Sequence, residues 1–128
     1  MAQKKPTESE LAILQILWSR GPSSVRQVNE LLNTKREVGY TTTLKIMQLM
    51  LDKGLVERDA QARTHIYKAG VSEKDTRKHL LERFVDTTFR GSAMDLVMQA
   101  IGNKDTSLEE LDEIKAYIER IERDRKKK

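Results

Sequence analysis

The residues best suited to contact a macromolecular partner are four polar side chains close together in the sequence. If residues 41–53 are helical, these side chains fall on one side, because each residue turns an α-helix by about 100°. They are Thr41, Thr42, Lys45 and Gln48. In the major groove of DNA, threonine offers a hydroxyl and a methyl group, lysine reaches guanine or a phosphate, and glutamine pairs with adenine. The pattern indicates a recognition helix, and the alternative is the solvated side of an ordinary amphipathic helix.

A basic ribbon is predicted directly after this helix. Residues 55–59 and 64–69 are short β-prone runs on either side of residues 60–63, a pattern that predicts a hairpin. Arg63 lies at the predicted turn and Arg58 on the first strand. Such a wing places arginine on DNA phosphates or in the minor groove. The alternative is a charged surface turn.

Local signals define the helices that must position these residues. Thr7 with Glu10, and Ser24 with Gln27, have the spacing of capping boxes and predict the starts of two helices. Gly21-Pro22 ends the first helix, and Gly54 is placed to end the third in the left-handed conformation. Three helices followed by a hairpin is the order of a winged helix-turn-helix, predicted here for residues 1–70.

Residues 71–128 have a different character. Apolar residues recur at helical spacing, and Gly91 and Gly102 divide the region into three short helices. Either Thr106 with Glu109 or Ser107 with Glu110 caps the last one. Short amphipathic helices bury little surface alone, so this half is predicted to be a helical dimerisation region that packs against a second copy. The residues expected at that interface are Leu80, Phe84, Leu96, Leu111, Ile114, Ile118 and Ile121. The predicted fold class is mainly α with a small β-hairpin.

The charge of the chain is unevenly distributed. Residues 1–70 carry 11 Lys or Arg against 7 Asp or Glu, whereas residues 71–128 carry 13 of each. The basic excess therefore lies in the half that is predicted to face an anionic partner.

Several kinds of chemistry are not predicted. The 128 residues contain no cysteine, which excludes disulfides, iron–sulfur clusters and thiol catalysis. His65 and His79 are the only histidines and lack partners at ligand spacing, so neither a metal nor a cofactor is expected. No catalytic motif is found, and the chain is predicted not to be an enzyme. Without a membrane-spanning or signal-type segment, it is expected to be soluble and cytoplasmic.

The order of motifs resembles the penicillinase-repressor family (BlaI/MecI type). The resemblance rests on the residues at 6–11, 16–18, 25–28, 39–43 and 52–58, and extends more loosely to the last acidic helix. It implies a dimeric repressor of an inverted-repeat operator, with Thr41, Thr42 and Lys45 in the groove and Arg63 in the wing. It also implies a regulator of the antibiotic-resistance type. Its partner would be a membrane sensor metallopeptidase, and proteolysis of the repressor would relieve repression.

Three features of the sequence depart from the family pattern. Leu49 occupies a position that is often arginine in the family, which predicts a different operator or fewer phosphate contacts. The family's cleavage segment commonly reads Leu-Val-Leu-Asn-Phe, whereas residues 96–100 here read Leu-Val-Met-Gln-Ala, without the Asn-Phe bond. The absence of cysteine excludes the copper sensing of another branch.

Two other functions fit the same pattern. A winged-helix regulator could sense a small ligand in the helical half, where Phe89, Met94 and Met98 would line a pocket. Alternatively, the winged helix could be a protein–protein interaction module that binds no DNA.

Overall fold

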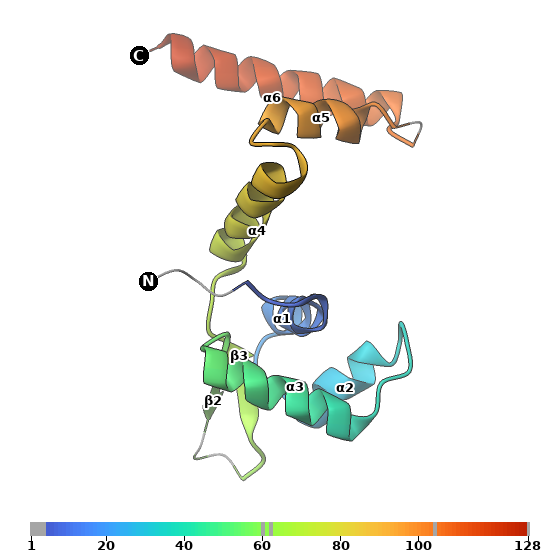
Figure 1. The fold of residues 1–128 in the computed structure, drawn as a ribbon, viewed down its shortest axis with the longest axis vertical. Coiled ribbons are helices and arrows are strands. Elements are labelled where there is room, and N and C mark those ends of the chain that lie inside the picture. The colour runs from blue at the N-terminus through green and yellow to red at the C-terminus, as the bar shows by residue number, and fades with distance from the viewer. Residues whose placement is uncertain (1–4, 60, 62, 104, 128) are drawn as a thin grey trace. The chain divides into compact units, whose positions relative to one another are not determined.

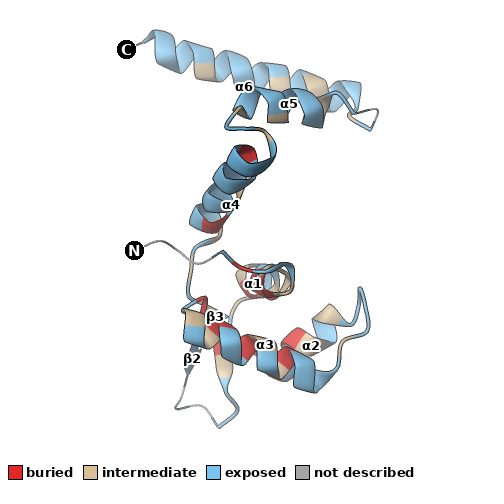
Figure 2. Ribbon diagram, in the orientation of Figure 1, coloured by how far each residue is buried: buried red, intermediate tan, exposed pale blue. Residues whose placement is uncertain are grey.

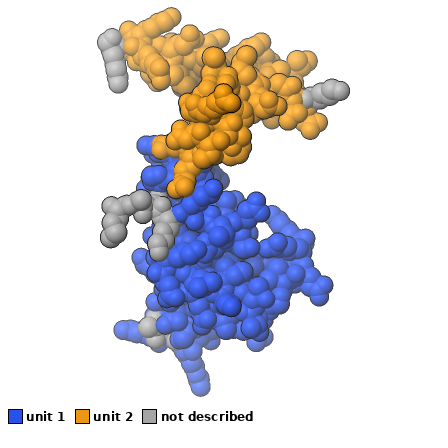
Figure 3. Space-filling view, viewed as in Figure 1, with its two compact units in different colours: residues 1–81 blue, residues 82–128 orange. Residues whose placement is uncertain are grey.

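The computed structural model describes residues 5–59, 61, 63–103 and 105–127. The chain forms two compact units, residues 1–81 and 82–128 (Figure 3). The elements, labelled in Figure 1, are α1 (Glu8–Arg20), β1 (Ser23–Ser24), α2 (Val25–Leu32), α3 (Tyr40–Lys53), β2 (Val56–Asp59), β3 (Ile66–Ala69), α4 (Glu73–Thr88), α5 (Ala93–Ile101) and α6 (Leu108–Lys126).

The predicted helix ends are confirmed. At the start of α1, the Glu10 N–H donates to Thr7 Oγ1 at 3.2 Å and the Thr7 N–H donates to Glu10 Oε1 at 2.9 Å. The same reciprocal pair joins Ser24 and Gln27 at the start of α2. Of the two candidate caps for α6, Ser107 with Glu110 is the one that forms. Gly54 ends α3 with φ 82°, a left-handed conformation that favours glycine.

The sheet has one strand more than the predicted hairpin. Its order is β1-β3-β2, with Ser23 opposite Tyr67 and Ser24 opposite Ile66. The third strand, β1, is only two residues long, and its second residue, Ser24, is also the N-cap of α2. It is therefore too short to give an alternating pattern in the sequence. The hairpin strands β2 and β3 lie within the predicted runs. Ala60 and Ala62 of the predicted turn lie outside the described residues.

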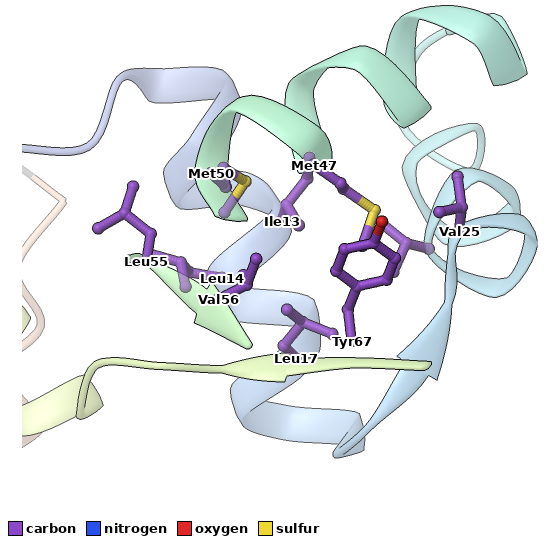
Figure 4. Close-up of a cluster of buried hydrophobic side chains, with 10 residues drawn as sticks. Ile13, Leu14, Leu17, Val25, Met47, Met50, Leu55, Val56 and Tyr67 are labelled. Atoms are coloured by element: carbon purple, nitrogen blue, oxygen red, sulfur yellow. The ribbon is translucent and has the colours of Figure 1, made fainter. Parts of the chain in front are cut away.

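One apolar core holds the first unit together. Its ten buried side chains come from every helix and hairpin strand of residues 1–70 and from the α3–β2 junction (Figure 4). They are Ile13, Leu14, Leu17, Val25, Val28, Met47, Met50, Leu55, Val56 and Tyr67. Tyr67 of β3 is 1% exposed, so its ring is a packing residue of this core. Figure 2 shows these buried positions on the inner sides of α1, α2 and α3, so each helix has one inward and one outward side.

The first unit extends past Gly70, where the sequence predicts the domain division. Trp18 Nε1 donates to the Val71 carbonyl at 3.0 Å, and Val71 packs against the core. A Cβ at Gly70 would lie 2.9 Å from the Gly54 carbonyl oxygen, so Gly70 allows the chain to pass close to its neighbour. By packing, residues 71–81 belong with the winged helix, and the functional division at residue 70 stays a prediction.

The second unit has little core of its own. Val85 is the only buried hydrophobic residue among those described in residues 82–128. The rings of Phe84 and Phe89 meet edge to face, with centroids 5.8 Å apart. Arg90 (φ 52°) and Gly91 (φ 85°) turn the chain between α4 and α5. None of the helices built from described residues, in either unit, has the length and apolar character needed to cross a membrane.

Candidate nucleic-acid interface

Burial fixes which side of α3 faces outward. Thr43, Met47 and Met50 are 0% exposed, and they lie on the side that packs on the core. Three other apolar residues of the helix, Leu44, Ile46 and Leu51, are partly buried and pack against the same core. Thr43 was not predicted to be buried. Its hydroxyl has a hydrogen-bond partner inside the fold.

That partner belongs to a hydrogen-bond network at the start of α3. Asn29 Nδ2 donates to Thr43 Oγ1 at 2.8 Å and to the Val38 carbonyl at 2.9 Å. Asn33 Nδ2 donates to the same carbonyl at 2.8 Å, and Asn33 Oδ1 accepts from the Val38 N–H at 3.0 Å. Because two residues at the end of α2 hold the backbone of Val38, the turn between α2 and α3 has a defined path.

An ion pair fixes the other end of α3. Lys53 Nζ lies 2.7 Å from Glu10 Oε2, and the Glu10 side chain is 4% exposed. Burial alone raises the pKa of Glu10, but the hydrogen bonds from Lys53 and from the Thr7 backbone outweigh it and lower this pKa below its ordinary value of 4.5. Glu10 therefore stays ionised and ties the last turn of α3 to the first turn of α1.

The outward side of α3 carries all four residues predicted to read DNA. Thr41, Thr42, Lys45 and Gln48 are exposed and lie opposite the buried residues. Asp52 shares this side one turn after Gln48 and adds a negative charge at its C-terminal end. Leu49 also lies there, 48% exposed. The positive end of the helix dipole and the first free N–H groups are at the Thr41 end, where an anion is favoured.

The two predicted wing residues are exposed as well. Arg58 lies in β2, opposite Tyr67 of β3, and Arg63 lies in the connection between the strands. Lys68 of β3 is 3.4 Å from Glu57 of β2, with both side chains more than 60% exposed. Solvent screens such a pair strongly, so it stabilises the ribbon little.

A concavity beside α3 contains residues that were not predicted. Its volume is about 450 Å³, and it brings together the start of α2, the start of α3 and the end of the hairpin connection. The ionisable side chains in its lining are Arg26, Tyr40, His65 and Tyr67, and none of them is a carboxylate. The full lining is Ser24, Val25, Arg26, Tyr40, Leu44, Thr64, His65 and Tyr67. Arg26 lies two residues after the Ser24 cap, so its place in the first turn of α2 could be predicted from the sequence.

The described residues offer no metal site. No group of three or more His, Asp or Glu side chains among them is placed to hold an ion. The exposed surface of α3 and the neighbouring basic residues are suited to a polyanion that is bound by hydrogen bonds and charge.

Three helices, a three-stranded antiparallel sheet and an outward-facing α3 define a winged-helix protein. A solved structure with this fold is the monomeric form of Bacillus licheniformis BlaI in complex with the blaP half-operator. It has a TM-score of 0.50 and 16% identity, and it covers 58% of this chain and 90% of that one. Residues 6–120 match the model of the penicillinase repressor family, and the chain belongs to this family.

Curated relatives agree with the family assignment. The transcriptional regulator BlaI of Mycobacterium tuberculosis is 41% identical over 59 residues, which is 45% of this chain but only 43% of that protein. The methicillin resistance regulatory protein MecI of Mammaliicoccus sciuri is 20% identical over 88% of this chain and 91% of its own length. The penicillinase repressor of Bacillus licheniformis is 20% identical over 88% of each chain. The family consists of transcriptional repressors, which confirms that the chain is not an enzyme.

Proposed function

We propose that the chain is a homodimeric transcriptional repressor that binds an inverted-repeat operator, with α3 of each protomer in a major groove. One observation carries the proposal. The side of α3 opposite Met47 and Met50 exposes hydrogen-bonding and cationic side chains within about two turns of its start. A recognition helix uses this end of its surface to reach base edges.

The basic residues around α3 would hold the DNA backbone. Arg58 and Arg63 are exposed on the wing, and Arg26 lines the concavity between α2, α3 and the hairpin. Each cation that neutralises a phosphate releases a counterion, so binding should weaken steeply with salt. These contacts set the register of the protein on DNA, and the α3 side chains read the sequence.

The test uses duplexes selected from a random pool by the full-length protein. Fluorescence anisotropy is measured over a salt series for the wild type and for Lys45→Ala. We expect Lys45→Ala to bind roughly tenfold more weakly, since one good base or phosphate contact is lost. The matched control is Lys35→Ala, which removes an exposed lysine beyond the other end of α2. If Lys45→Ala binds DNA with unchanged affinity and an unchanged salt slope, Lys45 does not contact the DNA.

Exposed apolar surface supports dimerisation through the second unit. Ile118 on α6 is 47% exposed and Phe84 on α4 is 49% exposed. The remaining five predicted residues are half-buried, and four of them lie in the second unit, whereas Leu80 lies in the first. Leu111, Ile114, Ile118 and Ile121 follow a heptad-like spacing. A second copy covering these helices would supply the core that one chain lacks.

Sedimentation analysis tests this interface. Ile118→Asp places a charge on the seam and should convert the dimer to a monomer at micromolar concentration. Ala116→Asp adds the same charge on the opposite side of α6 and should leave the dimer intact. If the wild type is monomeric, or if both variants stay dimeric, the proposed interface is wrong.

Relief of repression would follow from a change in, or proteolysis of, this dimerisation region. Gln99 and Ala100, at the position of the family's cleaved bond, are exposed but lie within α5. A protease needs such a segment to unfold locally before it can bind it. Co-expression with a membrane sensor metallopeptidase of the kind that the family resemblance implies should lead to cleavage of the chain within residues 96–100. An intact chain in induced cells would leave a non-proteolytic change as the remaining route.

One observation favours a second candidate, a ligand-sensing regulator. Two of the three residues named for a pocket, Phe89 and Met98, line a concavity of about 590 Å³ in the second unit, whereas Met94 is not in its lining. The other lining residues are Asp95, Gln99, Gly102 and Asn103. A thermal-shift screen with small cationic and aromatic compounds tests it, with Met98→Gln expected to abolish any stabilisation found.

A further inference from the structure

The first unit exposes few large apolar side chains, and two of them are on α3. Among its described residues in α1–α3 and the sheet, the exposed large hydrophobics are Leu31 at 36%, Tyr40 at 49% and Leu49 at 48%. Leu49 lies on the outward side of α3, where at 100° per residue it falls between Lys45 and Thr42. It therefore lies on the same side of the helix as Lys45, one turn further along, and Lys45 is proposed to enter the major groove.

The fold does not require a leucine at this position. Leu49 is absent from the residues that form or border the core, whereas its neighbours Met50 and Leu51 are among them. An exposed leucine neither donates nor accepts a hydrogen bond and carries no charge. It cannot bind a phosphate or the polar edge of a base, but it gains from contact with another apolar group.

The major groove offers one such group. Thymine carries a methyl at C5, and the same position of cytosine carries one when that base is methylated. We propose that Leu49 contacts the 5-methyl group of a pyrimidine, so that the operator has a methyl-bearing base facing the third turn of α3. This inference rests on the proposed function, and it adds a specific chemical preference to it.

Replacing thymine by uracil tests the contact, because only the methyl is lost. In a duplex selected by the wild-type protein, each dT is replaced in turn by dU and the affinity is measured by anisotropy. At one position in each half-site, the replacement should weaken wild-type binding roughly fourfold, because one methyl-sized apolar contact is lost. With Leu49→Ala, the same replacement should have no effect. If the selected base is cytosine instead, 5-methylcytosine should strengthen wild-type binding at that position alone.

The control is Leu31→Ala, which removes an exposed leucine at the end of α2 and should keep the full response to dU. Circular dichroism confirms that each variant is folded. The proposal is overturned if no dT is sensitive in the wild type and 5-methylcytosine has no effect, or if Leu49→Ala retains the sensitivity. If the wild type selects no duplex, both this inference and the proposed function fail. If Lys45→Ala weakens binding but Leu49→Ala keeps the wild-type response, only the inference about Leu49 fails.

Discussion

Replacing Glu10 by Gln should destabilise the first unit at neutral pH. The substitution keeps the side-chain volume, and glutamine still suits the third position of a capping box. It removes the negative charge 2.7 Å from Lys53 Nζ. It also leaves one amide oxygen where two carboxylate oxygens accept from Thr7 and Lys53.

The expected loss of stability depends on the hydrogen bond that is removed and on how far Lys53 is rehydrated. A hydrogen bond to a charged group contributes about 1.5–3 kcal/mol. Lys53 is 32% exposed and regains water when its partner is neutral, so the full penalty of a buried unpaired charge does not apply. We therefore expect a loss of about 1–2 kcal/mol, which lowers the Tm of a domain of this size by roughly 4–16 °C.

The pH dependence gives a second measurement of the same ion pair. The pKa of Glu10 is lower in the folded protein than its ordinary value of 4.5, so the unfolded state binds this proton more readily. The stabilisation is fully present above the unfolded pKa and is lost as the pH falls through the folded pKa. The stability difference between wild type and Glu10→Gln should be constant near neutral pH and shrink below about pH 4.5.

Urea denaturation followed by circular dichroism at several pH values is the assay. Glu8→Gln is the control, since it removes the same charge from an exposed position in the same helical turn. In a double-mutant cycle, Lys53→Met should cost little once Glu10 is glutamine. Equal stabilities of wild type and Glu10→Gln at pH 7, or a difference undiminished at pH 3, would refute the role given to this pair.

Three further predictions concern α3. Met47→Ala, at a fully buried site, should lower the free energy of unfolding by about 2–5 kcal/mol, and a urea midpoint like that of Gln48→Ala would contradict it. Thr43→Val keeps the side-chain shape but leaves one Asn29 N–H without its acceptor at 2.8 Å, so it should lose about 1–2 kcal/mol in the same assay. Thr42→Val, at an exposed site, should change the free energy of unfolding little. Equal losses of stability for Thr42→Val and Thr43→Val would argue against the buried hydrogen bond. Leu49→Arg adds a cation beside Lys45 and should steepen the log–log salt dependence of DNA binding by about 0.9, whereas an unchanged slope would place Leu49 away from the DNA backbone.

Features that depend on neighbours in sequence were predictable, and features that depend on distant contacts were not. The cap at Ser24 and the end of α3 at Gly54 follow from local chemistry, and both are confirmed. Strand β1 forms only because β3, more than 40 residues later, provides its partner. The ion pair of Glu10 with Lys53 likewise joins residues 43 apart, and neither side chain alone indicates it.

The same distinction between local and distant contacts holds for the residues of the candidate site. Helical phase placed Lys45 and Gln48 outward, and both are exposed. The same reasoning placed Thr41 and Thr42 outward and made no prediction for Thr43. Thr43 is the buried one because Asn29 of α2 offers its hydroxyl a hydrogen bond. Arg26 and His65 were missed as neighbours of α3, because only the packing of α2 and the hairpin brings them to one concavity.

Three separate restraints therefore determine which side of α3 faces outward. The core holds Met47 and Met50, Asn29 holds the start of the helix, and Glu10 holds its end. Rotating α3 by one residue, or about 100°, would bury Gln48 in place of Met47 in one direction. In the other direction it would bring Asp52 to the place of Lys53, beside the Glu10 carboxylate. Either change would cost more than the ~1 kcal/mol of one hydrogen bond. The outward side is thus fixed by the fold and not by contact with DNA. Substitutions at Thr41, Thr42, Lys45 or Leu49 should consequently change binding while leaving stability nearly unchanged, since none of these side chains is buried.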